Sequence, residues 1–381
     1  MEERGNGYLL QIFGVIFIVS FVSLAGYWVW FNNYYEPEDW SKYTDPEDDD
    51  IYLTTDLSYG NFDVGNDIII WEGEVPTMDQ YRSETYMHRF DIEKREYSRY
   101  DNSLDIYDAP RINGEHFILK TSSYDRDFIE IYDLEFRAKN SFGADNINGM
   151  DLDDEKVVIH TVVEEEYPVR PPFYYEKKYV QKFIIYDIET REKKDVTTTC
   201  NTAIFAVKDD HIAYKLDNQT QPYGSVQQYE LHLYDIDTNK TLKIHNTTEE
   251  IRRILIGGDD LIWVEGTNYN ENKTLYIYSL DENREYMHFE IGKNSSIDFD
   301  GRYIVWVEGG IHQFDLQEDV TTTIPGTEDA IIPKVDGRYI VYSSEFRDSE
   351  YYYGSNYDHL NFYDRETGEI MKLLRNKPTW A

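Results

Sequence analysis

Residues 185–190 read Ile-Tyr-Asp-Ile-Glu-Thr, and variants of this phrase recur along the chain. The other close copies are residues 233–238 and 362–368. The aspartate of the seven copies, or the serine that replaces it once, is Asp91, Asp133, Asp187, Asp235, Ser279, Asp315 and Asp364. Successive copies are 42, 54, 48, 44, 36 and 49 residues apart. A unit of about 45 residues with alternating apolar positions is typical of β-propeller blades.

A second repeat precedes each copy of the first. It consists of a turn followed by a short apolar run, and its clearest copies are residues 300–306 (DGRYIVW) and 336–342 (DGRYIVY). Asp-Gly before a β-branched and aromatic run is a hairpin signal, because glycine accepts positive φ and aspartate can bond the turn backbone. Each unit therefore contains an inner strand, the β-branched strand, the Tyr-Asp strand and an outer strand. The sequence predicts an all-β, seven-bladed β-propeller with four-stranded antiparallel blades.

With these motifs the chain resembles the TolB-like and related surface propellers of prokaryotes. In those proteins one strand typically reads D-G-x-x-[IV]-[VA]-[WY] and another [IL]-[YW]-[DN]-[LI]-x-T-[GK]. The resemblance is best at residues 300–306 and 336–342 and covers residues 52–376. It implies an interaction scaffold, and no catalytic residue can be carried over from it, because the Trp, Tyr and Asp residues of these motifs are packing and turn residues. The aromatics that end the second strands are expected to pack between blades or beside turns: Trp71, Tyr214, Trp263, Trp306 and Tyr342.

One apolar segment precedes the repeats. Residues 8–31 hold no charged residue in 24 positions and would span about 36 Å as a helix, enough for a bilayer core. Aromatic residues close the segment as an interfacial belt would: Tyr27, Trp28, Trp30 and Phe31. A cleaved signal peptide is the alternative, because residues 23–25 offer small side chains before Gly26. The apolar run continues past Ala25, so an uncleaved transmembrane anchor is favoured.

Arg4 lies before this segment, and no base follows it until Lys42. The positive-inside rule therefore predicts a cytoplasmic N-terminus and an extracytoplasmic propeller at the cell membrane. The expected organisation is a tail at residues 1–7, the anchor at 8–31, an acidic stalk at 32–50, the propeller at 51–376 and a tail at 377–381. Cys200 is the single cysteine of the sequence, and a ring of paired strands needs no disulfide.

The net charge of −37 argues against a nucleic-acid partner or an anionic lipid surface for the propeller. Solubility and adaptation to salt or acid are alternative reasons for the acidity. Five Asn-x-Ser/Thr triplets are possible glycosylation sites: Asn218, Asn239, Asn246, Asn272 and Asn294.

Blades three, four, five and seven have long connections between the second and third strands, in blade three from Glu164 to Lys178. Equivalent connections leave a propeller on one face, and aromatic-rich loops on a rigid scaffold often form binding surfaces. The predicted binding residues are Tyr174, Tyr175, Tyr223, Tyr269, Tyr351, Tyr352 and Tyr353. Packing of these tyrosines against the blades is the alternative.

Other chemistry has weak support. His88, His232, His312 and His359 lie on or beside third strands and are interpreted as structural. No metal site and no cofactor are expected, and the acidic run at residues 151–155 is interpreted as a solvated face. We expect a binding scaffold for a protein or glycan, without committing to enzymatic activity. A polysaccharide hydrolase or lyase with carboxylates at the channel mouth and a structural envelope subunit are the alternatives.

Overall fold

A computed structural model describes residues 51–53, 56–76, 83–100, 109–123, 126–170, 174–198, 200–218, 228–266, 271–293, 295–346 and 357–375. The chain divides into two compact units, Met1–Tyr52 and Leu53–Ala381, and the repeats belong to the second. The expected anchor and stalk lie outside the described residues. Among the residues that are described, no helix is long and apolar enough to cross a membrane.

Seven sheets of consecutive antiparallel strands make up the second unit. Blade one contains β2 (Asp56–Gly65), β3 (Ile68–Pro76), β4 (Ser83–Asp91) and β5 (Glu96–Arg99). Blade two contains β6 (Arg111–Asn113), β7 (His116–Ser123), β8 (Arg126–Asp133) and β9 (Ala138–Ala144). Blade three contains β10 (Ile147–Asp153), β11 (Lys156–Arg170), β12 (Tyr174–Asp187) and β13 (Lys193–Thr197). Blade four contains β14 (Phe205–Lys208), β15 (His211–Asn218), β16 (Gln228–Asp235) and β17 (Lys240–Thr247).

The remaining three blades repeat this order. Blade five contains β18 (Ile251–Gly257), β19 (Asp260–Glu265), β20 (Lys273–Ser279) and β21 (Arg284–Ile291). Blade six contains β22 (Ile297–Phe299), β23 (Tyr303–Val307), β24 (Ile311–Asp315) and β25 (Val320–Ile324). Blade seven contains β26 (Ala330–Asp336), β27 (Tyr339–Phe346), β28 (Tyr357–Asp364) and β29 (Ile370–Arg375), and β1 (Ile51–Leu53) adds a fifth strand beside β29.

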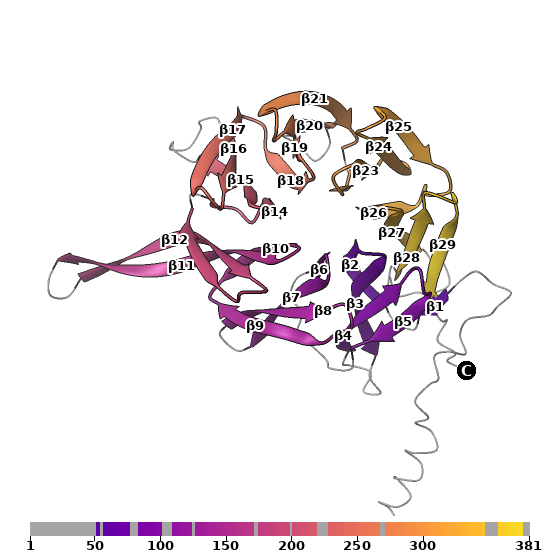
Figure 1. Cartoon of the computed structure of the whole chain (residues 1–381), viewed down its shortest axis with the longest axis horizontal. Helices are drawn as coiled ribbons and strands as arrows, with labels where there is room; N and C mark the ends of the chain where they lie inside the picture. Colours follow the sequence, from indigo (N-terminus) through magenta and orange to yellow (C-terminus); the bar gives the residue numbers. More distant parts are fainter. Residues whose placement is uncertain are drawn as a thin grey trace, which may run out of the picture. The chain divides into compact units, whose positions relative to one another are not determined.

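The sheets stand around a central opening with their first strands innermost (Figure 1). The predicted seven-bladed propeller and its four-stranded antiparallel blades are thus confirmed. The four strands of each blade are consecutive in sequence, and β1, which precedes blade one, pairs with β29 in the sheet of the last blade. Contacts of β2 with the last blade also join the two ends of the ring, among them the ion pair of Asp63 with Lys334.

The aspartates of the Tyr-Asp phrases, here called the turn aspartates, fix the hairpin that ends each third strand. Asp187 Oδ1 accepts a hydrogen bond from the backbone N–H of Thr190 at 2.7 Å, and Asp235 does the same for Thr238 at 2.7 Å. Ser279 Oγ plays this part in blade five, accepting from Glu282 at 3.2 Å. The same kind of bond is made by Asp91, Asp133, Asp315 and Asp364. The repeat is therefore local turn chemistry.

Two turn aspartates also bind the arginine of the Asp-Gly-Arg-Tyr turn. Asp315 receives Nε and Nη2 of Arg302 at 3.2 and 2.8 Å. Asp364 receives Nε of Arg338 at 2.8 Å and a second bond from Nη2. In both blades this fork ties the turn between the first two strands to the end of the third strand.

The hydrophobic cores lie between neighbouring blades. One buried cluster joins Ile118, Ile129 and Phe142 of blade two to Met150 and Ile159 of blade three. Similar clusters join blades one and two, three and four, four and five, five and six, and six and seven. Burial of these apolar faces holds the blades side by side.

The aromatics that end the second strands are buried, as predicted: Trp71, Tyr214, Trp263, Trp306 and Tyr342 are 1 to 5% exposed. Three of them stack on a histidine of the third strand, in the pairs Trp71–His88, Tyr214–His232 and Trp306–His312 with ring centroids 5.2, 5.4 and 5.3 Å apart. Burial lowers the pKa of His88 to about 3, so its ring is neutral. The structural interpretation of these three histidines is confirmed, whereas the side chain of His359 is not among those described.

Blade three differs from its expected form. Its second-to-third connection is a two-stranded ribbon rather than a loop, because β11 and β12 remain paired as far as Arg170 and Tyr174. In this register Glu165 pairs with Lys178 and Glu166 pairs with Lys177. The ribbon projects away from the ring (Figure 1).

Candidate functional site

The structure describes only part of the predicted tyrosine surface. Tyr174 and Tyr175 lie on β12, paired in register with Arg170 and Pro168. Tyr223, Tyr269, Tyr351, Tyr352 and Tyr353 lie outside the described residues. Their connections join β15 to β16, β19 to β20 and β27 to β28, which are second and third strands in each case. Because antiparallel strands alternate in direction, these connections and the ribbon leave from one face of the ring, here called the connection face.

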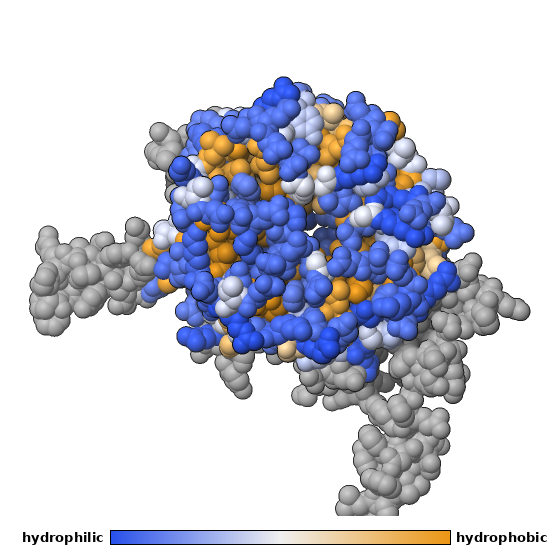
Figure 2. All heavy atoms as spheres, viewed as in Figure 1, coloured by the Kyte–Doolittle hydropathy of each residue, from blue (hydrophilic) through white to orange (hydrophobic). Residues whose placement is uncertain are grey.

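The central channel is lined by many polar and charged residues. One cavity in it has a volume of about 230 Å³ and is lined by residues from the inner strands of all seven blades. Hydrophilic residues surround the central hollow, and hydrophobic residues show in patches between them (Figure 2). The channel is therefore the natural place to look for a site besides the connection face.

One position on each inner strand, the third before the turn, forms a ring around the channel. The strand registers align seven residues at this position: Asp63, Arg111, Asp151, Ala206, Leu255, Asp298 and Lys334. Five consecutive blades, from six through seven and one to three, thus carry charges of alternating sign. Blades four and five contribute an apolar arc of alanine and leucine.

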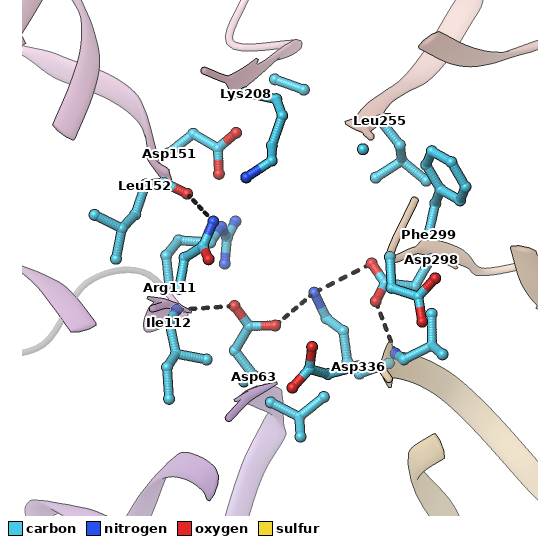
Figure 3. A pocket seen from close by; sticks show the side chains of 18 of the residues that line it. Asp63, Arg111, Ile112, Asp151, Leu152, Lys208, Leu255, Asp298, Phe299 and Asp336 are labelled. Carbon is cyan, nitrogen blue, oxygen red and sulfur yellow. Dashed lines mark hydrogen bonds and ion pairs between the residues drawn. The ribbon is translucent and has the colours of Figure 1, made fainter. Parts of the chain in front are cut away.

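Aspartates of this ring join each blade to the next. Asp63 accepts a hydrogen bond from the N–H of Ile112 at 3.1 Å, Asp151 from Val207 at 2.8 Å, and Asp298 from Val335 at 2.9 Å. In each case the donor lies on the inner strand of the following blade. Figure 3 shows the bond from Ile112 to Asp63. These carboxylates therefore hold neighbouring blades together through hydrogen bonds.

A hydrogen bond of the same kind joins the last blade to the first. Asp336 accepts a hydrogen bond at 2.7 Å from the backbone N–H of Asn66, which is 270 residues away in sequence. Lys334 lies between two blades, with Nζ 3.1 Å from Asp63 and 3.7 Å from Asp298. We call Asp63, Asp151, Asp298 and Asp336 the channel aspartates.

Three of the channel aspartates, Asp151, Asp298 and Asp336, are difficult to ionise. Burial raises the pKa of Asp151 and of Asp336 to about 6, and burial also raises the pKa of Asp298. Arg111 opposes this shift at Asp151, and Lys334 opposes it at Asp298. The channel wall removes water from these carboxyls more than the neighbouring cations compensate for it.

A second cavity of about 280 Å³ shares Arg111, Asp151, Ala206, Arg253 and Leu255 with the first. It also touches residues near the starts of inner strands, such as Asn148 and Ala203, so it lies toward the connection face. Its ionisable lining consists of Arg111, Arg252, Arg253 and Asp151. The first cavity holds five aspartates and four bases. The channel therefore changes from acidic at the turns to basic toward the connection face.

The expectation that the acidic run at residues 151–155 is a solvated face is wrong for two of its aspartates. Asp151 accepts a hydrogen bond from the N–H of Val207 in the next blade, and Asp153 is only 4% exposed. Asp153 binds Lys208 Nζ at 2.6 Å and the amide of Asn113 at 3.2 Å. Tertiary packing against blades two and four explains the difference. Within the described ranges, no group of three or more His, Cys, Asp or Glu residues could hold a metal ion.

The possible glycosylation sites differ in exposure. Asn239, Asn246 and Asn272 are exposed. Asn218 is half-buried and donates from its amide to Glu230 at 2.9 Å, while Asn294 lies outside the described residues. Cys200 is a buried free thiol whose pKa burial raises to about 12.

Sequence reasoning did not single out the channel residues. Asp63, Arg111, Asp298 and Lys334 stand in inner strands, which share no obvious motif. One signal was present, namely their constant spacing of three residues before each hairpin turn. That spacing becomes informative only once the inner strands are known to face a common channel.

Similar folds are known among solved structures. The β-propeller domain of the trilobed protease from Pyrococcus furiosus is 15% identical, with a TM-score of 0.61 over 87% of this chain and 99% of that one. Acylaminoacyl peptidase from Pyrococcus horikoshii is 14% identical, with a TM-score of 0.60 over 84% of this chain and 52% of that one. This chain thus spans about half the length of that peptidase.

The uncharacterized protein lmo1340 from Listeria monocytogenes is 13% identical, with a TM-score of 0.56 over 87% of this chain and 98% of that one. An oligogalacturonate lyase in complex with manganese is 11% identical, with a TM-score of 0.52 over 86% and 92%. TolB from Acinetobacter baumannii matches with a TM-score of 0.41, too low to argue from. No family model and no curated protein matches the chain.

At these identities the likeness concerns the fold alone. The chain is a seven-bladed β-propeller protein, and its neighbours include the propellers of peptidases and of a lyase. The expected resemblance to prokaryotic propellers is supported at this level, without a narrower family.

Proposed function

We propose that this chain is a membrane-anchored, extracytoplasmic propeller that binds a protein or glycan partner through its connection face. The blades supply a rigid frame, because each is paired throughout and sealed to its neighbours by buried apolar clusters. Binding residues are often carried on segments that project from such a frame.

The blade-three ribbon is the observation that carries this proposal. Pairing of β11 with β10 ends at Thr161, and pairing of β12 with β13 ends at Lys182. One further backbone bond follows on each side, from Val162 to Asn146 and from Thr198 to Gln181. Beyond these bonds, in the part of the chain that the structure describes, the two strands pair only with each other. The ribbon extends about 30 Å from Val162 to Arg170 at the usual rise per residue. A lone two-stranded ribbon is marginally stable in water, so a partner that covers it would stabilise it.

A polysaccharide hydrolase or lyase remains the alternative function. It would need carboxylates free for catalysis, whereas Asp63, Asp151 and Asp298 each accept a backbone hydrogen bond from the next blade. This arrangement favours the binding function. A structural envelope subunit differs from both in needing no soluble partner, and the experiment below separates it.

The membrane part of the proposal depends on the uncharged segment at residues 8–31 and on Arg4 before it. We expect the full chain to stay with the membrane after carbonate washing and its propeller to be cleaved by protease added from outside. Release by carbonate, or protection from external protease, would contradict this topology.

Shortening the ribbon tests the binding function. Glu164 and Tyr179 face each other in register, so replacing residues 165–178 by Asn-Gly leaves a two-residue hairpin turn. We expect the shortened full chain, in detergent, to melt like the parent but to lose binding to envelopes from cells that lack the native protein. A second variant with Tyr174 and Tyr175 changed to serine keeps the ribbon and isolates the aromatic side chains.

Unchanged envelope binding by the shortened chain would overturn the role of the ribbon. A parent that binds no envelope, yet is recovered in a stable assembly with other membrane proteins, would favour the structural subunit.

A further inference from the structure

The bases of the channel fall into two groups. Lys334 is paired with Asp63 and Asp298, and Lys208 is paired with Asp153. In contrast, no carboxylate of the described residues forms an ion pair with Arg111 or Arg253. Arg111 donates from Nη1 to the carbonyls of Ala109 and Pro110 on its own segment, at 3.3 and 3.1 Å. Arg253 is exposed, and its side chain makes no hydrogen bond within the described part of the chain.

Unpaired guanidinium groups are unexpected in this composition. The sequence has 74 acidic residues and 37 lysines and arginines, so each base has on average two acids available. A planar guanidinium group matches carboxylate and phosphate oxygens with two parallel hydrogen bonds. Two such groups that line one cavity and form no ion pair with a carboxylate of the described residues indicate a place for an anion from outside the chain.

The surroundings also suit a small organic anion. Both arginines line both channel cavities, and they come from blades two and five, so they approach the channel from different sides. Met150, Ile204, Phe205 and Leu255 supply apolar wall to the cavity of about 280 Å³. This volume lies below the usual range for sites of drug-sized ligands, which limits the occupant to a small molecule.

Competing carboxylates are few at this end of the channel. Asp151 is the one acidic residue in the described lining of this cavity, and its Oδ2 accepts the N–H of Val207. Arg252, the third arginine there, is occupied, because its Nε donates to the carbonyl of Gly266 at 2.8 Å and its Nη2 lies 2.9 Å from Glu250. Arg111 and Arg253 are therefore the groups available to a ligand.

We propose that the end of the channel toward the connection face is a binding site for a small organic molecule with an oxyanion group, carboxylate or phosphate, held by Arg111 and Arg253. The site is independent of the ribbon. Loss of ribbon-dependent binding and loss of anion binding are separate observations on separate variants.

Calorimetric titration of the full chain in detergent tests the site with three probes that share one ring: glucuronate, glucose 6-phosphate and glucose. We expect at least one acidic probe to bind about tenfold or more tightly than glucose, since a hydrogen-bonded charge contributes a tenfold factor or more. The acidic probe that binds more tightly identifies the oxyanion. Added salt should weaken the binding.

Two variants and a matched control assign the binding to these residues. Arg253→Gln and Arg111→Gln should each weaken the acidic probe about tenfold and leave glucose unchanged. Lys208→Gln removes a channel base that Asp153 already pairs with, so it should change the affinity less than about twofold. Arg253→Gln should fold normally, because this side chain has no described protein partner.

Three results would each overturn the proposal. The first is equal binding of glucose and the acidic probes, and the second is an equal effect of Lys208→Gln and Arg253→Gln on affinity. The third is no binding of any probe at about 10 mM, a concentration that would detect even very weak sites.

Discussion

The turn aspartates and the channel aspartates are the same side chain in opposite electrostatic settings. Hydrogen bonds from Arg338 lower the pKa of Asp364 to about 2, while burial raises the pKa of Asp151 to about 6. Asp364 has a cation and a backbone N–H group close by. Asp151 receives one N–H from the next blade and is shielded from water. The ionised carboxylate is therefore favoured at the turn and disfavoured in the channel.

The largest expected effect is at a turn aspartate. Asp364→Ala removes the fork with Arg338 and the bond from the N–H of Glu366, which should lower the free energy of unfolding by about 2 to 3 kcal/mol. Asp187→Ala, which loses the bond to Thr190 at a turn where no arginine fork is described, should lower it by about 1 kcal/mol. Urea unfolding at pH 7 measures both. Equal losses would mean that the arginine fork adds nothing.

The pH dependence of stability should reflect both kinds of aspartate. Although burial raises the pKa of Asp133, Lys139 and Arg137 lower it to about 2, and that of Asp364 is also about 2. Their stabilisation is present above the unfolded pKa of about 4 and is lost as the pH falls toward 2. Asp151 and Asp336, with pKa values of about 6, favour the folded state at low pH and lose that contribution as the pH rises from about 4 through 6.

These opposite signs predict a maximum of melting temperature near pH 4 (about the unfolded pKa of aspartate), followed by a decline as the pH rises to about 6. Scanning calorimetry across about pH 2 to 9 would locate the maximum. Stability that rises steadily up to pH 8 would show that the channel carboxyls ionise without cost.

A smaller and more specific effect is expected at one channel aspartate. Asp151→Asn keeps an oxygen acceptor for the N–H of Val207 but cannot ionise. Relative to the parent, the variant should therefore be more stable at pH 8 than at pH 4.5, by an amount of about 1 to 2 kcal/mol. The measurement is the difference in unfolding free energy between variant and parent at the two pH values. A difference that does not change with pH would rule out burial of the charge.

The smallest effect concerns the joint between the last and first blades. A double-mutant cycle with Lys334→Met and Asp63→Asn should give a coupling of about 1 kcal/mol, because the pair is largely screened from water and lies 3.1 Å apart. A coupling near zero at low salt would show that the apolar contacts between blades close the ring without this pair.

The sequence was a good guide wherever structure depends on neighbours in the chain. The turn aspartates, the hairpin turns and the buried aromatics such as Trp263 and Trp306 were predicted because turn bonding and strand alternation act over a few residues. Prediction was less successful for the segment from Glu164 to Lys178, because its length was taken to indicate a loop. The continued pairing of β11 with β12 becomes visible only when the two strands are placed in register.

The tyrosine surface stays a prediction, because five of its seven members lie outside the described residues. The channel site was missed for a different reason. Arg111 and Arg253 are separated by 142 positions in the sequence, and each looks like an ordinary surface base until the ring brings them to one cavity.

By itself the sequence determined the number of blades, the order of their strands and the turn that ends each third strand, because hydrogen bonds within a few residues specify them. Only the tertiary structure decided which charges are paired and which are left free. Ring closure places Lys334 between Asp63 and Asp298 and brings the N–H of Asn66 to Asp336. It leaves Arg111 and Arg253 without an ion pair to a carboxylate of the described residues. The physical reason is that charges interact through space and through local exclusion of water, which chain order does not encode.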